Sequence, residues 1–173
     1  DPDLAGWSGL GFVVQAYQKR APLVVDWLVE LARQTNRRFM VRLVKGAYWD
    51  AEIKHAQEQG LTSYPVYTRK ANTDLSYEVC AGRLLAHPDQ VAPQFATHNA
   101  HTVCMVEALA HGNPFEFQRL HGMGHMLFDQ LARSRGVAVP LRVYAPVGKL
   151  EPMKTCFPTW CGVCSKTAPT VRL

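Results

Sequence analysis

The sequence predicts an α/β protein in which parallel strands alternate with helices, as they do in part of a (β/α)8 barrel. Short apolar runs, nearly continuous as in strands buried on both faces, alternate with longer runs of helical period. The composition is globular, since 47% of the 173 residues are hydrophobic and 19% are charged. A repeated strand and helix unit of this kind predicts a parallel sheet covered by helices.

Five apolar runs predict strands, and they begin 28, 54, 23 and 25 residues apart. The long second interval leaves room for an additional helix. The repeat is therefore one strand and one helix, with a single insertion. The predicted strands are residues 11–17, 39–45, 93–97, 116–120 and 141–146.

The helices are predicted from apolar residues at helical spacing. The clearest begins at Pro22, a favourable first helical residue, and carries an apolar stripe. Its members, at spacings of three, four and seven, are Val24, Trp27, Leu28 and Leu31. The other predicted helices are residues 49–59, 74–87, 101–111 and 124–134, the first of which Gly60 ends.

Polar residues at the ends of the predicted strands favour a barrel over an open, doubly wound sheet. A barrel gathers the carboxyl ends of all its strands around one mouth, whereas a doubly wound sheet uses mainly its switch point. Five strands cannot close an eight-stranded barrel, so we expect a fragment of one or a smaller sheet with bare edges. The polar residues are Gln15, Arg42, Lys45, Thr97, His98, Gln118, His121 and Tyr144.

Charge and cysteine content narrow the class of protein. The net charge is +5, but residues from Lys149 onward contribute +3 of it, which leaves +2 of mixed sign in residues 1–148. This argues against nucleic-acid binding. An odd number of cysteines and the lack of a secretory signal predict a cytoplasmic protein without a disulfide framework, in which Cys80 and Cys104 are small buried apolar residues.

No apolar run approaches the roughly 20 residues that a membrane-spanning helix needs. The sequence also lacks the glycine pattern of a dinucleotide-binding Rossmann site and that of a P-loop. A nicotinamide-dependent or nucleotide-hydrolysing site is therefore not predicted.

The predicted mouth has many cations and neutral hydrogen-bonding groups and few carboxylates. It suits a planar, anionic guest such as a phosphate-bearing cofactor. Arg42 lies within an apolar strand and needs partners there, either a ligand or an internal ion pair. Directly after the strand, Gly46 and Ala47 allow close backbone approach, and Tyr48 and Trp49 can stack on rings.

Histidines near two strand ends raise the alternative of a metal-dependent hydrolase on the same barrel. His121 and His125 are four apart, a spacing that zinc ligands often have on a helix. No acidic residue ends the strand at 141–146, and Cys156, Cys161 and Cys164 lack a nearby fourth ligand. We therefore predict no metal site, and the hydrolase stays an alternative, as does a non-catalytic remnant.

Seven segments in order resemble the proline dehydrogenases, most closely the proline dehydrogenase domain of bacterial bifunctional proline utilisation proteins. The resemblance covers residues 3–148 with little gapping. Any one segment is suggestive, and all seven together are highly specific. They are LAGW (4–7), VVQAYQKRA (13–21), VRLVKGAYWD (41–50), YPVYTRK (64–70), FATHNAHT (95–102), EFQRLHGMG (116–124) and RVYAPVG (142–148).

The resemblance implies a (β/α)8 barrel that holds FAD at the carboxyl ends of its strands and oxidises L-proline to Δ1-pyrroline-5-carboxylate. The flavin N5 takes a hydride from proline C5, and a membrane quinone then receives the electrons. It also implies a cytoplasmic parent protein that associates peripherally with the membrane and contains an aldehyde dehydrogenase region.

Roles for individual residues follow from the same resemblance. Arg42 is expected beside the flavin N5, and Tyr48 and Tyr144 are expected to wall the proline pocket, so these three form the expected catalytic set. Gln15 and Gln118 are expected at the edge of the flavin ring. The remaining expected cofactor contacts are Val44, Gly46, Ala47, Trp49, Lys70, Thr97, His98 and Asn99.

The resemblance stops near residue 148, which divides the chain into a barrel segment, 1–148, and an unrelated tail, 149–173, expected to be irregular. It implies that three strands precede the segment, bringing a lysine and an aspartate to the active site. It also implies a following helix with the pattern Tyr-x-x-Arg-Arg-x-x-Glu, which binds the proline carboxylate. Without these parts we expect a fragment with little or no activity.

A frameshift is our hypothesis for the tail. Codons for Lys154 to Pro169, read one base earlier, encode EDLLPYLVRRLLENGA, which has the pattern of that family helix. Resequencing the gene is expected to reveal a one-base insertion or deletion near residues 148–153. An intact reading frame without an indel relative to relatives contradicts the hypothesis.

Overall fold

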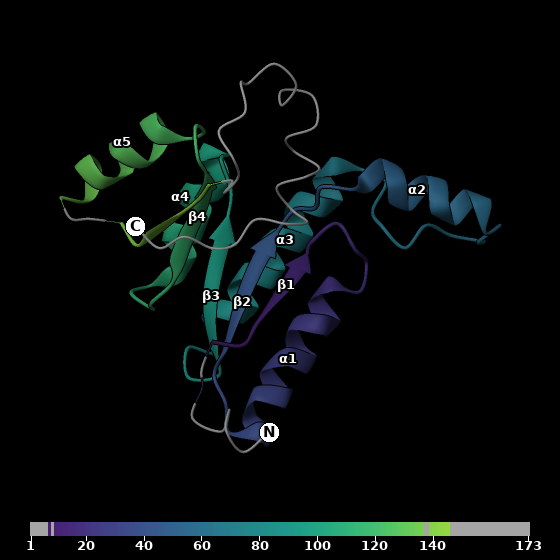
Figure 1. Cartoon of the computed structure of the whole chain (residues 1–173), viewed down its shortest axis with the longest axis horizontal. Coiled ribbons are helices and arrows are strands. Elements are labelled where there is room, and N and C mark those ends of the chain that lie inside the picture. The colour runs from purple at the N-terminus through teal and green to yellow at the C-terminus, as the bar shows by residue number, and fades with distance from the viewer. Residues whose placement is uncertain (1–6, 8, 137–138, 146–173) are drawn as a thin grey trace, which may run out of the picture.

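The computed structural model describes residue 7, residues 9–136 and residues 139–145 (Figure 1). The elements are β1 Gly11–Gln15, α1 Ala21–Thr35, β2 Phe39–Val44, α2 Trp49–Glu58, α3 Lys70–Leu85, β3 Val91–Ala96, α4 Ala100–Ala110, β4 Glu116–Leu120, α5 His125–Arg135 and β5 Leu141–Tyr144. In chain order, one helix follows β1, β3 and β4, two helices follow β2, and β5 is the last described element.

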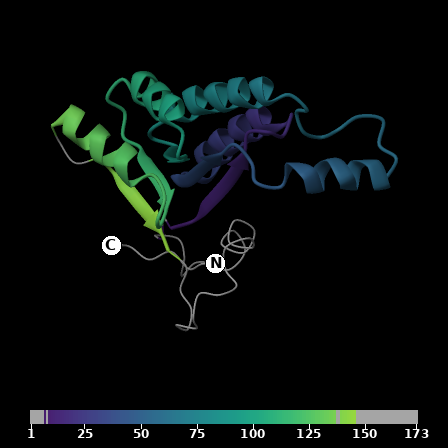
Figure 2. The same cartoon turned by 90° about the horizontal axis from the view of Figure 1, so that it is seen from above.

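The five strands form one parallel sheet in the order β1-β2-β3-β4-β5. A doubly wound sheet reverses its strand order at a switch point, whereas a barrel adds each strand next to the previous one. Seen from above, the sheet is curved, with α1, α3 and α4 on its outer side (Figure 2). The predicted fold class, part of a (β/α)8 barrel with five parallel strands, is confirmed.

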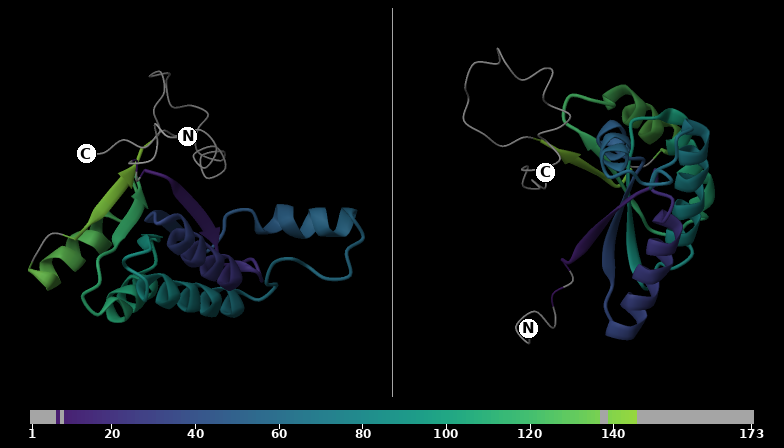
Figure 3. Two further views of the ribbon diagram at one scale, coloured as in Figure 1. Left: turned by 90° about the horizontal axis from the view of Figure 1, so that it is seen from below. Right: turned by 90° about the vertical axis from the view of Figure 1, so that its right-hand side faces the viewer.

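The two faces of the sheet differ in what covers them. Along β2, Phe39, Val41 and Leu43 are fully buried, and the residues between them are partly exposed. These buried residues pack against the helices. The partly exposed residues between them therefore lie on the inner side of the curved sheet, and we call this side the concave face. Figure 3 shows from two further directions that the described helices leave this face uncovered, while α2 extends away from the sheet.

Helix α1 packs on the sheet through a stripe that differs from the predicted one. Trp27 was expected on the buried stripe, but it is 58% exposed. The buried face is instead formed by Ala21, Val25, Leu28, Val29 and Ala32. Alanines contribute to this face because the helix lies close to the sheet. A search for large apolar residues in the sequence does not find such positions.

Phenylalanines form the centre of the core under α4 and α5. The rings of Phe115 and Phe117 are 5.0 Å apart in an edge arrangement, and Phe117 also contacts Phe128 at 5.5 Å. Of the two cysteines expected to be buried, Cys80 is buried in this core but Cys104 is exposed. Cys104 lies on the outer side of α4, so its predicted burial is wrong.

Several element bounds differ from those predicted. β1 ends at Gln15 because the chain then turns, and the Tyr17 amide donates to the Lys45 carbonyl at 2.8 Å. β3 begins at Val91, two residues before Pro93, although proline cannot donate to a ladder. Helix α3 begins at Lys70 instead of residue 74.

The predicted tail, residues 149–173, lies outside the described residues, as does the frameshifted helix. Within the described ranges, no helix is both long and apolar enough to cross a membrane.

Candidate functional site

The concave face gathers polar side chains from all five strands. Register places Val13 beside Arg42 and Gln15 beside Val44, so Gln15 and Arg42 are on the same face. Arg42 in turn pairs with Gln94, and Gln118 with Arg142. Of the residues predicted from sequence, the strands bring together on this face Gln15, Arg42, Val44, Gln118 and Tyr144.

Arg42 lies on β2 within this face and stacks on an aromatic ring. Its guanidinium carbon is 5.4 Å from the centroid of the Tyr144 ring, although two strands separate β2 from β5. The contact spans the curve of the sheet and holds the cation by a cation–π interaction. The Arg42 Nε is buried and has no hydrogen-bond partner in the described part of the chain. One donor of a fixed cation therefore remains for another group.

A second polar cluster, which the sequence did not predict as part of the site, lies beside Arg42. The Glu116 carboxylate accepts two hydrogen bonds from Arg142, at 2.7 and 2.8 Å. It also accepts from the Nε2 atoms of Gln118 at 2.9 Å and Gln94 at 3.2 Å. Hydrogen bonding to Glu116, despite the opposing effect of burial, raises the pKa of Arg142. The cluster joins β3, β4 and β5 on the concave face.

Gln118 is the most buried polar residue of the site, at 1% exposure. Its Nε2 is used by Glu116, whereas its Oε1 is buried and has no partner among the described residues. A buried acceptor of this kind costs about 1–3 kcal/mol unless a donor reaches it. Gln118 thus offers a hydrogen-bond acceptor from the middle of β4.

The loop after β2 is fixed by its backbone and contains a position that only glycine fills. Gly46 has φ +133°, and a Cβ there would lie 2.6 Å from the ring of Tyr17. Trp49 donates from Nε1 to the Tyr67 carbonyl at 2.8 Å. Gly46 and Ala47 are exposed, and Trp49 is 40% exposed. This loop therefore presents backbone and an aromatic ring at the mouth.

Two tyrosines beside this loop have buried hydroxyls. The Tyr48 and Tyr17 hydroxyls are both without a partner within the described ranges. Burial, with a smaller contribution from the charge of Glu52, raises the pKa of Tyr17. Tyr17 therefore stays neutral at physiological pH, and its ring is part of the wall behind Gly46.

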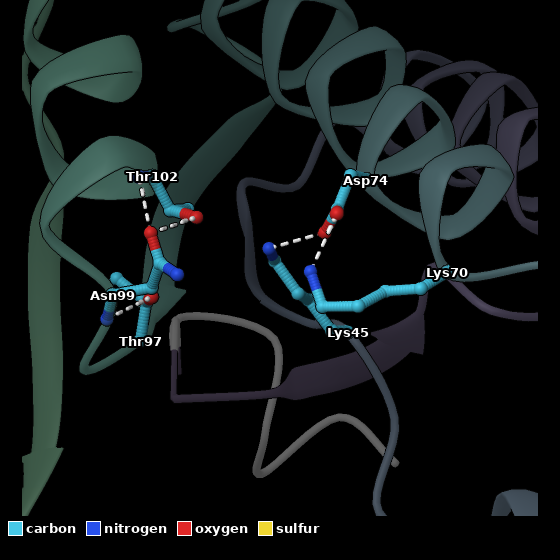
Figure 4. A network of polar contacts seen from close by, with 6 residues as sticks. All are labelled: Lys45, Lys70, Asp74, Thr97, Asn99 and Thr102. Carbon is cyan, nitrogen blue, oxygen red and sulfur yellow. Dashed lines mark hydrogen bonds and ion pairs between the residues drawn. The ribbon is translucent and has the colours of Figure 1, made fainter.

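Two lysines meet one carboxylate at the mouth (Figure 4). Lys45, just after β2, and Lys70, the first residue of α3, donate to different oxygens of Asp74 at 2.5 and 2.6 Å. The Lys45 ammonium also lies 5.8 Å from the ring centroid of Tyr77. Two cations share one anion, so the cluster keeps a net positive charge that suits an anionic ligand. Lys45 and Asp74 were not among the predicted ligands.

The protonation of Asp74 leads to a stability prediction. Burial favours a higher pKa for Asp74, but hydrogen bonds and charge from Lys45 and Lys70 outweigh it, and the pKa lies below its ordinary value of 3.8. Ionised Asp74 therefore stabilises the fold above that value, and the contribution is lost as pH falls through the lower, folded-state pKa. The carboxylate is more than one-third exposed, so we expect at most about 1 kcal/mol.

We expect Asp74→Asn to lower the free energy of unfolding by this amount at neutral pH. The difference between the variant and the wild type should shrink as the pH falls below 3.8. Urea unfolding across the acidic range measures it. A difference that is independent of pH contradicts the role given to the Asp74 charge.

The segment after β3 is held by its own side chains. The backbone N–H of Asn99 donates to Thr97 Oγ1 at 3.1 Å. The side-chain Oδ1 of Asn99 accepts from the backbone N–H of Thr102 at 3.1 Å and so caps α4 (Figure 4). His98 Nε2 accepts from the Leu120 amide at 3.1 Å. Burial, and then the charge of Arg119, lowers the pKa of His98, which keeps the ring neutral as an acceptor.

His125, one of the two histidines considered as metal ligands, contacts an arginine instead. His125 lies against the Arg119 guanidinium, with ring nitrogens 3.1 and 3.4 Å from its terminal nitrogens. A neighbouring guanidinium disfavours a metal cation. Among the described residues, no three His, Cys, Asp or Glu side chains are grouped to hold a metal ion.

Sequence reasoning missed part of the site because its signal lies in strand register. Glu116 and Gln118 are two residues apart in β4, so the sequence indicates that they share one face of the sheet. Their neighbours on that face come from other strands, which the sequence of β4 does not reveal. Gln94 is the Cα partner of Glu116, and Arg142 that of Gln118. The residues missed are Asp74, Gln94, Glu116 and Arg142, whereas Lys45 was expected at the mouth but given no role.

The fold and this face define the class: an α/β-barrel segment with a polar, cationic inner face at the carboxyl ends of its strands. A model of the proline dehydrogenase family matches residues 1–155, and the chain belongs to that family. The resemblance seen in the sequence is confirmed.

Curated relatives and solved structures agree with this family. The bifunctional protein PutA of Salmonella typhimurium is 57% identical over 158 residues, and that of Escherichia coli is 56% identical; each alignment covers 87% of this chain and 12% of the relative. The structure of a Bradyrhizobium japonicum proline utilization A variant aligns with TM-score 0.81 and 59% identity, covering 86% of this chain and 15% of that one. This chain therefore spans a small part of the length of the relatives it matches.

Proposed function

We propose that this segment forms part of an FAD-dependent proline dehydrogenase that oxidises L-proline to Δ1-pyrroline-5-carboxylate. The observation that carries the proposal is the pair of buried polar atoms on the concave face, Arg42 Nε and Gln118 Oε1, which lack partners among the described residues. They offer a cationic donor and a neutral acceptor to one guest. Family membership supports the choice of a flavin as that guest.

The residues present fit a flavin dinucleotide in charge and in hydrogen-bonding capacity. An isoalloxazine ring has carbonyl oxygens that accept hydrogen bonds and a ring N–H that donates one, and its diphosphate is anionic. Gln15, Arg42, Val44 and Gln118 would hold the ring on the concave face. The loop and the mouth would hold the remainder through Gly46, Ala47, Trp49, Lys70, Thr97, His98 and Asn99.

FAD, when bound, would supply the two-electron oxidation, in which proline C5 gives up a hydride. The chain supplies binding, orientation and charge. Arg42, kept in place by its stacking on Tyr144, would place a fixed cation beside the ring and so stabilise the reduced, electron-rich cofactor. The lysines around Asp74 provide a positive environment for the diphosphate.

The tyrosines provide the proposed walls of the proline pocket. Tyr144 is partly buried beneath Arg42, and Tyr48 has a buried hydroxyl at the start of α2. Aromatic faces suit the apolar pyrrolidine ring and exclude water from it. Together with Arg42, they form the proposed catalytic set.

The further parts of the proposal concern the parent protein. The PutA relatives are described as bifunctional, and the chain matches 12% of their length. We propose a parent with an aldehyde dehydrogenase region, a membrane quinone as electron acceptor and peripheral membrane association in the cytoplasm. We also propose a barrel segment at residues 1–148, an aberrant tail at 149–173, and no nucleic-acid binding by this segment.

The test uses the full-length protein that contains this segment, with the tail in the shifted frame and purified with FAD, which we call the full-length holoenzyme. We expect it to reduce a quinone or dye acceptor with L-proline, and to fail with D-proline. Turnover that survives removal of the flavin and responds to added metal contradicts the proposal and favours the hydrolase alternative.

A further inference from the structure

We propose that Glu116 is a positioning residue that fixes the Gln118 amide so that its oxygen, and not its nitrogen, faces the cofactor. The inference rests on the proposed flavin site. It assigns a function to a carboxylate at the start of β4, which belongs to the segment EFQRLHGMG but was given no role from the resemblance.

Glu116 accepts hydrogen bonds and does not donate them. Its two oxygens receive Arg142 Nε at 2.7 Å and Arg142 Nη2 at 2.8 Å, the two-bond geometry of a guanidinium with an ionised carboxylate. Gln94 Nε2 donates to the same group at 3.2 Å. An ionised carboxylate has no proton to give. Any amide that contacts it must therefore turn its nitrogen toward it.

Gln118 is the amide for which this constraint matters. The contact from its Nε2 to Glu116 is 2.9 Å, and the residue is 1% exposed, so bulk water does not replace Glu116 as the partner of this amide. Turning the amide over would bring its oxygen against the carboxylate, with two acceptors facing each other. The orientation therefore follows from the chemistry of the contact, and Oε1 is left as a buried acceptor without a partner within the described ranges.

The oxidised isoalloxazine ring has one N–H donor, at N3, among several acceptors. An oxygen at Gln118 matches that donor, whereas an amide nitrogen there would match a ring carbonyl or an unprotonated ring nitrogen. Glu116 thus selects which edge of the ring this strand recognises. The nearby Arg142 serves a different purpose, because it neutralises Glu116 without contacting Gln118 in the bonds described.

The test compares binding of FAD with binding of N3-methyl-FAD, which lacks the N3 donor. For the wild-type full-length holoenzyme, reconstituted after flavin removal, we expect about tenfold tighter binding of FAD, as for one buried hydrogen bond. Glu116→Gln keeps the shape but can donate as well as accept, which frees the Gln118 amide to turn over. We expect the preference to fall to about twofold or less.

Arg142→Met is the matched control. It breaks the same ion pair as Glu116→Gln but leaves an acceptor-only group beside Gln118, so the tenfold preference should remain. Equal loss of preference in both variants overturns the inference and assigns the cluster a structural role only. A wild type that binds both flavins equally also overturns it, whereas a wild type that binds neither contradicts the proposed function instead.

A measurement on the wild type tests the same inference without relying on a variant that folds. With FAD labelled at N3 with ¹⁵N, the N3 proton resonance of the bound oxidised flavin should lie downfield of its position in free FAD, as a donor to a carbonyl oxygen does. A bound N3 proton at the free position overturns the inference without any substitution.

Discussion

Arg42→Met in the full-length holoenzyme should lower kcat/KM for L-proline by about 100- to 1000-fold, the range found when one fixed electrostatic donor is removed. The reason is the placement of its cation. Arg42 is held over the Tyr144 ring at 5.4 Å and has a buried Nε without a partner in the described chain. Methionine keeps much of the stem and removes the charge. Steady-state assays with saturating acceptor measure the loss.

The matched control is Arg38→Met. It is the same substitution, made at the residue directly before β2. Arg38 is exposed and donates to the Pro88 carbonyl at 2.8 Å, at the opposite end of the sheet from the site. We expect its kcat/KM to stay within about twofold of wild type, because surface changes away from a site have small effects. Equal losses in the two variants would contradict a specific role for Arg42.

Gly46→Ala should destabilise the protein by about 3–5 kcal/mol, combining backbone strain with overpacking. At φ +133° the backbone is outside the region that alanine readily adopts. The new methyl would also lie 2.6 Å from the ring of Tyr17, which is 2% exposed and cannot move aside. We expect a thermal midpoint of flavin release roughly 10 °C lower, together with weaker FAD binding.

Gly60→Ala separates strain from collision. Gly60 also has a positive φ, +62°, but no atom lies within 4 Å of a Cβ built there. We expect a cost of about 1 kcal/mol, and unchanged FAD affinity, because the residue lies after α2 and away from the concave face. If Gly46→Ala were no worse than Gly60→Ala, close packing of the loop on Tyr17 would not be required.

Much of the fold was predictable because it depends on local patterns. The strand at 116–120 was predicted with its observed bounds, and Gly60 ends the second helical segment close to where expected. The parts that failed depend on packing between elements. Trp27 was expected in the core because it is large and apolar, yet small alanines occupy the interface of α1 with the sheet.

The candidate site was predictable where residue type alone indicates function. An arginine in an apolar strand needs a partner, and Arg42 was singled out for that reason. Glu116 could not be recognised in the same way, because a lone acidic residue at a strand start resembles a solvated one. Its importance depends on the register that places Gln94 and Arg142 beside it. Register is set by packing of the whole sheet.

The central claim is that the concave face around Arg42 holds a flavin that proline reduces. The direct test is an anaerobic titration of the full-length holoenzyme with L-proline, followed by visible absorption. The account predicts that the oxidised flavin band disappears as proline is added and that Arg42→Met slows this loss. A flavin band that proline leaves unchanged in the wild type would contradict it.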